Sequence, residues 1–157
     1  MRRDHFELEA HNIDWVETGE TPAEPRVVID FHGPEETLTD RLTDAEGDIL
    51  EAGETDVTFR LQDSLDSPDA TGVVGVTDRI TGDFLLELNE DADDVLRFVR
   101  AAREYGQTTG DDGGRYSVVL QIDGEPVATY SKSTFLVYDA NGSLLRSKSL
   151  IPSGVEL

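Results

Sequence analysis

Apolar and polar residues alternate along several short segments of the chain, most regularly in residues 56–62. The same alternation recurs in residues 6–10, 26–32 and 116–122. A period of two is typical of a strand that buries one face and exposes the other. Residues 38–50 are predicted as two short edge segments joined by a turn, because an Asp-Ala-Glu-Gly-Asp stretch lies between them.

Turn signals between these segments predict how the strands are connected. An Asp-Gly pair at 123–124 and an Asn-Gly pair at 141–142 are typical of tight hairpins. Residues 116–151 are therefore expected to form a three-stranded meander. A second hairpin is predicted over residues 72–88, with Phe84 and the two leucines that alternate with it facing inward.

One segment has a helical period instead. Its apolar stripe consists of Val95, Phe98, Val99, Ala102 and Tyr105. Acidic residues at 90–94 stand where a helix dipole favours negative charge, and Gly106 is well placed to end the helix. We predict a helix over residues 91–105, packed on the C-terminal meander, where the continuous apolar run 135–138 indicates a strand covered on both faces. The expected fold class is mainly β: an antiparallel β-sandwich with one helix, in a single domain over residues 1–157.

The charge of the chain is far from balanced. The chain has 34 acidic and 13 basic residues, for a net charge of -21, and 11 of the basic residues are arginine. An acid excess with almost no lysine is typical of proteins that work in multi-molar salt, where screening removes the self-repulsion of so many charges. No apolar run reaches the roughly 20 residues of a membrane span, and no signal peptide is recognisable. We therefore expect a halophilic, cytoplasmic protein.

The same composition argues against several functions. Nucleic acids and anionic membranes are not expected as partners, because both are held by basic residues. The absence of cysteine removes thiolate nucleophiles. The glycine-rich residues 110–114 carry two acids and no lysine, so they do not resemble a phosphate loop. Serines at 131, 133, 147 and 149 are predicted on polar strand faces. No catalytic residue and no cofactor is assigned, and a non-enzymatic function is favoured over an enzyme of unrecognised class.

Three arginines on the predicted helix form the densest basic feature of the chain. Arg97, Arg100 and Arg103 follow at intervals of three and share the side opposite the apolar stripe. They are expected either to pair with nearby acids such as Glu104 or to bind an acidic protein partner, because arginine is favoured at interfaces. The apolar C-terminal residues 150–157 are expected either to pack against the sheet or to be bound by a partner. Together, the three arginines and this segment favour a protein-interaction module that binds another protein or a second copy of itself.

Metal binding is the alternative. Calcium prefers six to eight oxygen ligands, and two oxygen-rich loops offer Asp44, Glu46, Asp48, Asp63, Asp66 and Asp69. A calcium-binding β-sandwich that uses these end loops is therefore the second hypothesis. A carboxylate–imidazole site of Glu9, His11 and His32 is also conceivable. With so many acids, the simpler interpretation of each cluster is a hydrated surface.

Four stretches of the chain carry a resemblance to known proteins: residues 1–6, 56–61, 101–106 and 149–157. With these stretches the chain resembles an uncharacterised family of haloarchaeal proteins. The resemblance implies a salt-rich archaeal cytoplasm. It implies no activity and transfers no functional residue.

The charge analysis predicts that salt stabilises the protein. Between 0.1 M and 1 M salt the screening length falls from about 10 Å to about 3 Å. Self-repulsion among the acidic residues should therefore weaken, and the melting temperature should rise with KCl concentration. Thermal unfolding followed by circular dichroism measures this. A melting temperature that is independent of KCl, or that falls, would contradict the interpretation of the composition.

Overall fold

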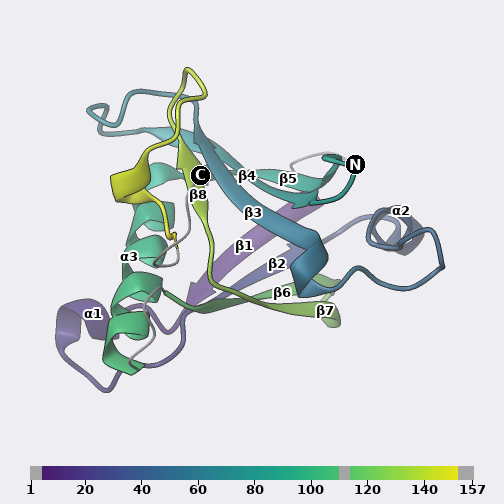
Figure 1. Ribbon diagram of the computed structural model, residues 1–157, viewed down its shortest axis with the longest axis horizontal. Coiled ribbons are helices and arrows are strands. Elements are labelled where there is room, and N and C mark those ends of the chain that lie inside the picture. Colours follow the sequence, from purple (N-terminus) through teal and green to yellow (C-terminus); the bar gives the residue numbers. More distant parts are fainter. Residues whose placement is uncertain (1–4, 110–113, 152–157) are drawn as a thin grey trace.

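Two four-stranded sheets face each other in the computed structural model, which describes residues 5–109 and 114–151 (Figure 1). The first sheet has the order β1 (Phe6–His11), β2 (Arg26–Phe31), β6 (Tyr116–Ile122) and β7 (Glu125–Lys132). The second has the order β5 (Phe84–Asp91), β4 (Thr71–Asp78), β3 (Thr55–Leu61) and β8 (Leu136–Tyr138). The predicted mainly-β, sandwich-like fold is confirmed.

The strand pairing is not antiparallel throughout, which corrects the prediction. β2 pairs with β6 in parallel, and β3 pairs with β8 in parallel, while the other four pairs are antiparallel. Parallel neighbours need a long crossover connection. Here β2 and β6 are separated in the chain by the other sheet's first three strands and by the long helix. The predicted C-terminal meander is therefore divided, with β6 and β7 in one sheet and β8 in the other.

The predicted helix is confirmed as α3 (Ala92–Thr109), which lies along one end of the two sheets (Figure 1). Its predicted stripe is buried except for the half-buried Tyr105. Phe98 packs edge-on against Tyr116, with ring centroids 5.5 Å apart, and also contacts Phe135 at 6.5 Å. The helix continues past Gly106, which is itself buried. Gly106 therefore does not end the helix, which corrects the prediction.

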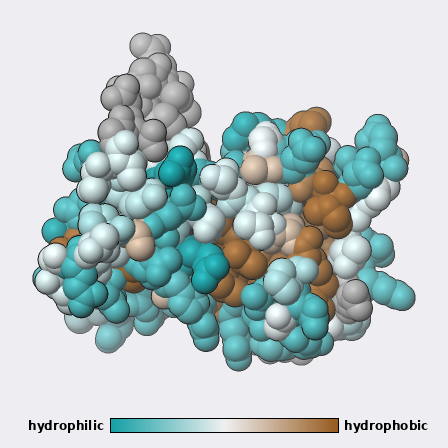
Figure 2. Space-filling view, turned by 90° about the horizontal axis from the view of Figure 1, so that it is seen from below, coloured by the Kyte–Doolittle hydropathy of each residue, from teal (hydrophilic) through white to brown (hydrophobic). Residues whose placement is uncertain are grey.

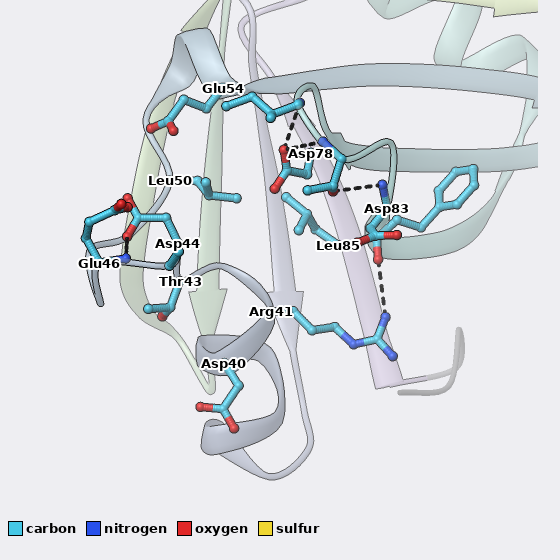
Figure 3. A pocket seen from close by; sticks show the side chains of 14 residues that line it. Asp40, Arg41, Thr43, Asp44, Glu46, Leu50, Glu54, Asp78, Asp83 and Leu85 are labelled. Carbon is cyan, nitrogen blue, oxygen red and sulfur yellow. Dashed lines mark hydrogen bonds between the residues drawn. The ribbon is translucent and has the colours of Figure 1, made fainter.

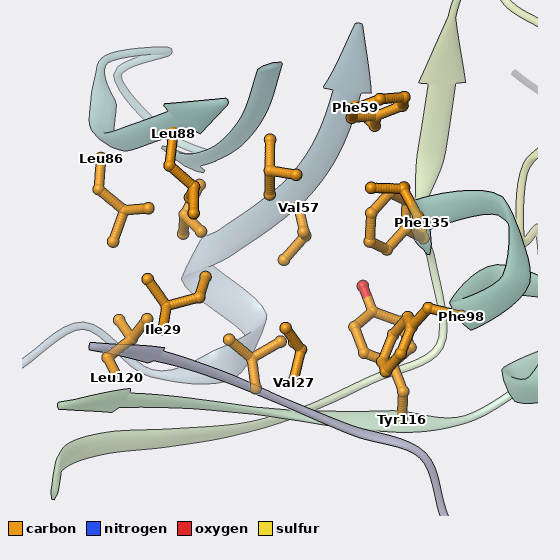
Figure 4. Close-up of a cluster of buried hydrophobic side chains, with 14 of the residues drawn as sticks. Val27, Ile29, Val57, Phe59, Leu86, Leu88, Phe98, Tyr116, Leu120 and Phe135 are labelled. Carbon is orange, nitrogen blue, oxygen red and sulfur yellow. The ribbon is translucent and has the colours of Figure 1, made fainter. Parts of the chain in front are cut away.

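Side chains from both sheets meet in one core (Figure 4). Ile29 and Leu120 point up from the first sheet, while Val57 and Leu86 point down from the second, and all four are at most 2% exposed. These residues occupy the alternating positions that predicted the strands, so burial of one face of each sheet is the reason for the alternation.

Two features of the middle of the chain differ from the prediction. Residues 35–41 form α2 (Glu35–Arg41), where an edge segment was expected, although the turn that follows is present between the bridged Thr43 and Ile49. Leu38 and Leu42, four residues apart and both buried, are the helical signal that was missed. Phe84 is 50% exposed and does not face inward, because a bulge in the β4–β5 pairing shifts the register at its end of the strand.

The segment after β8 also differs from the predicted strand. It contains the 3-10 turn η3 (Arg146–Lys148), so Ser147 does not lie on a strand face. Ser149 is buried, and its hydroxyl accepts a hydrogen bond from the Val137 N–H and donates one to the Leu145 carbonyl. Its role is to connect this segment to β8. Residues 152–157 of the apolar C-terminal segment lie outside the described residues.

The buried polar side chains near β7 differ in whether they have a hydrogen-bond partner. The ammonium group of Lys132 donates to the carbonyl oxygens of Ala52 and Thr55 at 2.8 and 2.5 Å. The Tyr116 hydroxyl donates to the Thr134 carbonyl at 2.6 Å. The Tyr130 hydroxyl, in contrast, is buried without a hydrogen-bond partner among the described residues. An unsatisfied buried hydroxyl carries a desolvation penalty.

This contrast predicts opposite effects of the same substitution at the two tyrosines. Tyr130→Phe should raise the free energy of unfolding by about 1 kcal/mol, because it removes a hydroxyl that lost its water and gained no partner. Tyr116→Phe is the matched control and should lower it by about 1 kcal/mol through the lost hydrogen bond. Urea unfolding at constant KCl measures both. Equal destabilisation by the two substitutions would contradict the assignment.

The same tyrosine predicts a loss of stability in alkali. Burial raises the pKa of Tyr130 from its ordinary value of 10.0 to about 12. A raised pKa in the folded state contributes stability that is present below pH 10 and is lost as pH rises towards 12. The unfolding free energy of the wild type should therefore fall more steeply over this interval than that of Tyr130→Phe. Parallel profiles for the two proteins would show that Tyr130 ionises normally.

Candidate functional site

The three arginines of α3 border a groove between α3, α1 (Trp15–Thr18) and η3, called here the arginine groove. Both smaller elements lie beside the long helix (Figure 1). The groove has a volume of about 290 Å³. Its basic side chains are Arg97, Arg100, Arg103 and Lys148, and its apolar lining residues are Val16, Leu96 and Val99. Glu17 is the acidic residue among those that line it.

Arg97 connects α3 to α1. Its guanidinium donates to both carboxylate oxygens of Glu17, at 2.8 and 3.0 Å, and to Asp14 at 2.7 Å. This pairing lowers the pKa of Glu17 and raises that of Arg97, in each case chiefly through their shared hydrogen bond. Arg97 therefore pairs with nearby acids, as expected for the helix arginines, and the carboxylates of Glu17 and Asp14 compensate its charge.

Arg103 connects α3 to the segment after β8. Its guanidinium donates to the backbone carbonyls of Ser149, at 2.7 Å, and Ser147, at 3.4 Å. Carbonyl oxygens satisfy the donors without neutralising the charge. Arg103 therefore contributes positive potential to the groove while it holds η3 in place.

Arg100 and Lys148 are the accessible basic groups of the groove. The Arg100 side chain is 63% exposed, and its nearest carboxylate, that of Glu104 one turn along the helix, is 3.8 Å away. Exposed pairs of this kind contribute little stability. Lys148 is exposed on η3. It was missed in the sequence because it lies 45 residues beyond Arg103, although it is one of only two lysines in the chain.

The acidic hollow near α2 is a second depression, with a volume of about 690 Å³ (Figure 3). Asp44 and Glu46 of the predicted calcium loop line it, together with Asp78 and Asp83 from the β4–β5 turn. Figure 3 shows these two pairs on opposite sides of the hollow, with Leu50 and Leu85 between them. Carboxylates spread in this way do not converge on one point, which a calcium site needs.

Two of the six loop carboxylates proposed for calcium stabilise their own loops. One oxygen of Asp44 accepts hydrogen bonds from the backbone N–H groups of Glu46 and Asp48, both at 2.9 Å. Asp63 accepts from the backbone and hydroxyl of Thr71. Asp66 and Asp69 are exposed in the same loop. The structure shows no set of three converging oxygens among these six residues, and calcium binding by them stays a prediction.

One described group of carboxylates does converge, at the start of α3. Oxygens of Glu90, Asp91 and Asp94 lie within 4.8 Å of one another. Partial burial is the main cause that raises the pKa of Glu90. Negative side chains at this position are favoured by the helix dipole, which explains the cluster without a bound ion.

The predicted grouping of Glu9, His11 and His32 is not formed. His11 lies 3.4 Å from Glu9, as expected for neighbours on one strand face. His11 is opposite Arg26 in the β1–β2 register, whereas His32 follows Phe31 at the other end of the pair. An antiparallel register therefore separates the two histidines by nearly the length of the strand.

Comparisons with known proteins place the chain in a family without assigning it an activity. No helix among the described residues is long and apolar enough to cross a membrane. Neither the curated proteins nor the solved structures yield a match. The family model described as "Family of unknown function (DUF5793)" matches residues 1–157. This match covers the whole sequence, and it leaves the archaeal origin a prediction. The chain belongs to the DUF5793 family of unknown function.

Proposed function

We propose that this protein is a non-enzymatic interaction module that binds an acidic segment of a partner protein in the arginine groove. The observation that carries the proposal is the convergence of four basic side chains in one groove of a chain with a net charge of -21. The acidic residues that cover most of the protein's surface repel an acidic partner. The arginine groove is therefore the place where the charge of such a partner is complementary.

The composition of the groove specifies the partner further. Val16 and Leu96 provide an apolar lining between the basic side chains. Charge attraction alone is strongly screened in concentrated salt, whereas apolar contacts persist there. The expected ligand is therefore a segment in which carboxylates flank an apolar side chain, with the carboxylates directed at Arg100 and Lys148.

The test compares partner capture by three forms of the protein in multi-molar KCl. The groove variant carries Arg100→Gln and Lys148→Gln, which remove accessible charges and leave the structural contacts of Arg97 and Arg103 in place. The matched control carries Arg26→Gln and Arg60→Gln, two exposed arginines outside the groove. A partner retained by the wild type and the control should be lost, at least tenfold, from the groove variant.

Two outcomes would contradict the proposal. One is a partner that all three forms capture equally, and the other is a wild-type protein that captures nothing. Sedimentation of the purified protein in the same salt detects self-association. A dimer that the groove variant abolishes would identify a second copy of this chain as the acidic partner.

A further inference from the structure

A hollow with a volume of about 690 Å³ lies on the second sheet, on the side away from the core. Its floor consists of residues of β3 and β4 that alternate with core residues such as Val57 and Phe59. Gln62 and Ala140, from the loops that follow β3 and β8, line one end of it (Figure 1). The underside of the molecule is mostly hydrophilic, with apolar residues gathered in its middle (Figure 2). The hollow on the second sheet combines aromatic, hydroxyl and charged side chains, and is called here the aromatic hollow.

Two aromatic side chains line the aromatic hollow from opposite edges of the sheet. Tyr138 is opposite Arg60 in the β3–β8 register, and Phe84 is opposite Thr77 in the β4–β5 register. Phe84 is 50% exposed and is the aromatic member of the exposed large apolar side chains among the described residues. Its ring lies against Gly75, where an added Cβ atom would be 3.1 Å from the ring. The sheet therefore supports the Phe84 ring, while half of the side chain stays open to a ligand.

The polar side chains of the aromatic hollow balance each other in charge. Arg60 is the basic and Glu87 the acidic residue among those that line it, and Thr58 and Thr77 add hydroxyl groups. Glu87 is opposite Gly75 on β4, which is opposite Thr58 on β3, so these residues form one row across the sheet. In a chain with a net charge of -21, a hollow with one charge of each sign favours an uncharged ligand that offers hydrogen-bonding groups.

The strand order argues against two other classes of ligand. β3 and β4 have a neighbouring strand on both sides, so their backbone groups are used in the ladder of the sheet. An extended peptide therefore cannot be added as a further strand on this floor. A flat apolar surface of a partner protein would bury Arg60 and Glu87 without their water, which is unfavourable for charged groups. The ligand must therefore be recognised by side chains and must itself be both apolar and polar.

We infer that the aromatic hollow binds an uncharged oligosaccharide, with sugar rings stacked on Phe84 and Tyr138 and hydroxyl groups bonded to Arg60 and Glu87. One face of a pyranose ring presents C–H groups, which match the negative face of an aromatic ring. Neighbouring sugar hydroxyls both donate and accept, as a carboxylate and a guanidinium require. Three strand intervals separate β8 from β5, about 14 Å in all, which favours several sugar rings over one. This inference does not depend on the function proposed for the arginine groove.

The test is an NMR titration of the wild-type protein in multi-molar KCl with uncharged di- and trisaccharides of glucose, mannose, galactose and N-acetylglucosamine. At least one of these sugars should bind saturably and shift the ring signals of Phe84 and Tyr138. Tyr116 is the internal control, because its side chain is fully buried in the core and its ring signals should not move. This readout does not depend on how any variant folds. Absence of saturable binding by every sugar in the panel would overturn the inference.

Variants then locate the binding site. Phe84→Ala and Arg60→Gln should each weaken binding of the sugar about tenfold or more, because they remove a stacking surface and a hydrogen-bond donor. Ile80→Ala is the matched control, since Ile80 is 77% exposed in the adjoining β4–β5 turn and does not line the aromatic hollow. The groove variant with Arg100→Gln and Lys148→Gln should bind the sugar as the wild type does. Unchanged binding by both Phe84→Ala and Arg60→Gln would contradict the assignment.

Discussion

Contact among three aromatic rings fixes the position of α3 relative to both sheets. Phe98 on the helix, Tyr116 on β6 and Phe135 beside β8 pack mutually, with centroid separations from 5.5 to 6.5 Å. Each ring belongs to a different layer, so the contact closes one end of the sandwich and sets which side of α3 faces outward. The arginine groove depends on this contact, because the same helix carries Phe98 inward and Arg97 and Arg100 outward.

Basic residues are scarce in this chain, and several of them connect structural elements. Arg97 joins α3 to α1, and Arg103 joins it to the segment around η3. Lys132, 7% exposed, joins β7 to the backbone before and at the start of β3. Burial lowers the pKa of Lys132, because the charged form of the ammonium group loses its hydration there. Most of the described acidic residues, in contrast, are exposed.

The candidate sites were predictable to different degrees. Spacing of three along a helix was sufficient to place Arg97, Arg100 and Arg103 on one side, because a helix relates such residues by its own geometry. Lys148 lies beside them only because a segment distant in the sequence folds against the helix. No local sequence pattern predicts that contact. At the histidines, His11 and His32 were candidates for one site, but the antiparallel register places them at opposite ends of two strands and brings Glu7, Asp30 and Asp123 to His32 instead.

The sequence by itself determined the strands of the core, the long helix and the excess of surface charge. Each of these depends on a local property: a two-residue or 3.6-residue period of apolar residues, or a count of ionisable groups. Only the tertiary structure decided that β2 pairs with β6 and β3 with β8 in parallel, that β8 leaves the predicted meander, and that η3 closes the arginine groove. The alternation along a strand predicts which of its faces is buried. It does not predict which strand pairs with it, because every residue type except proline offers the same backbone donor and acceptor.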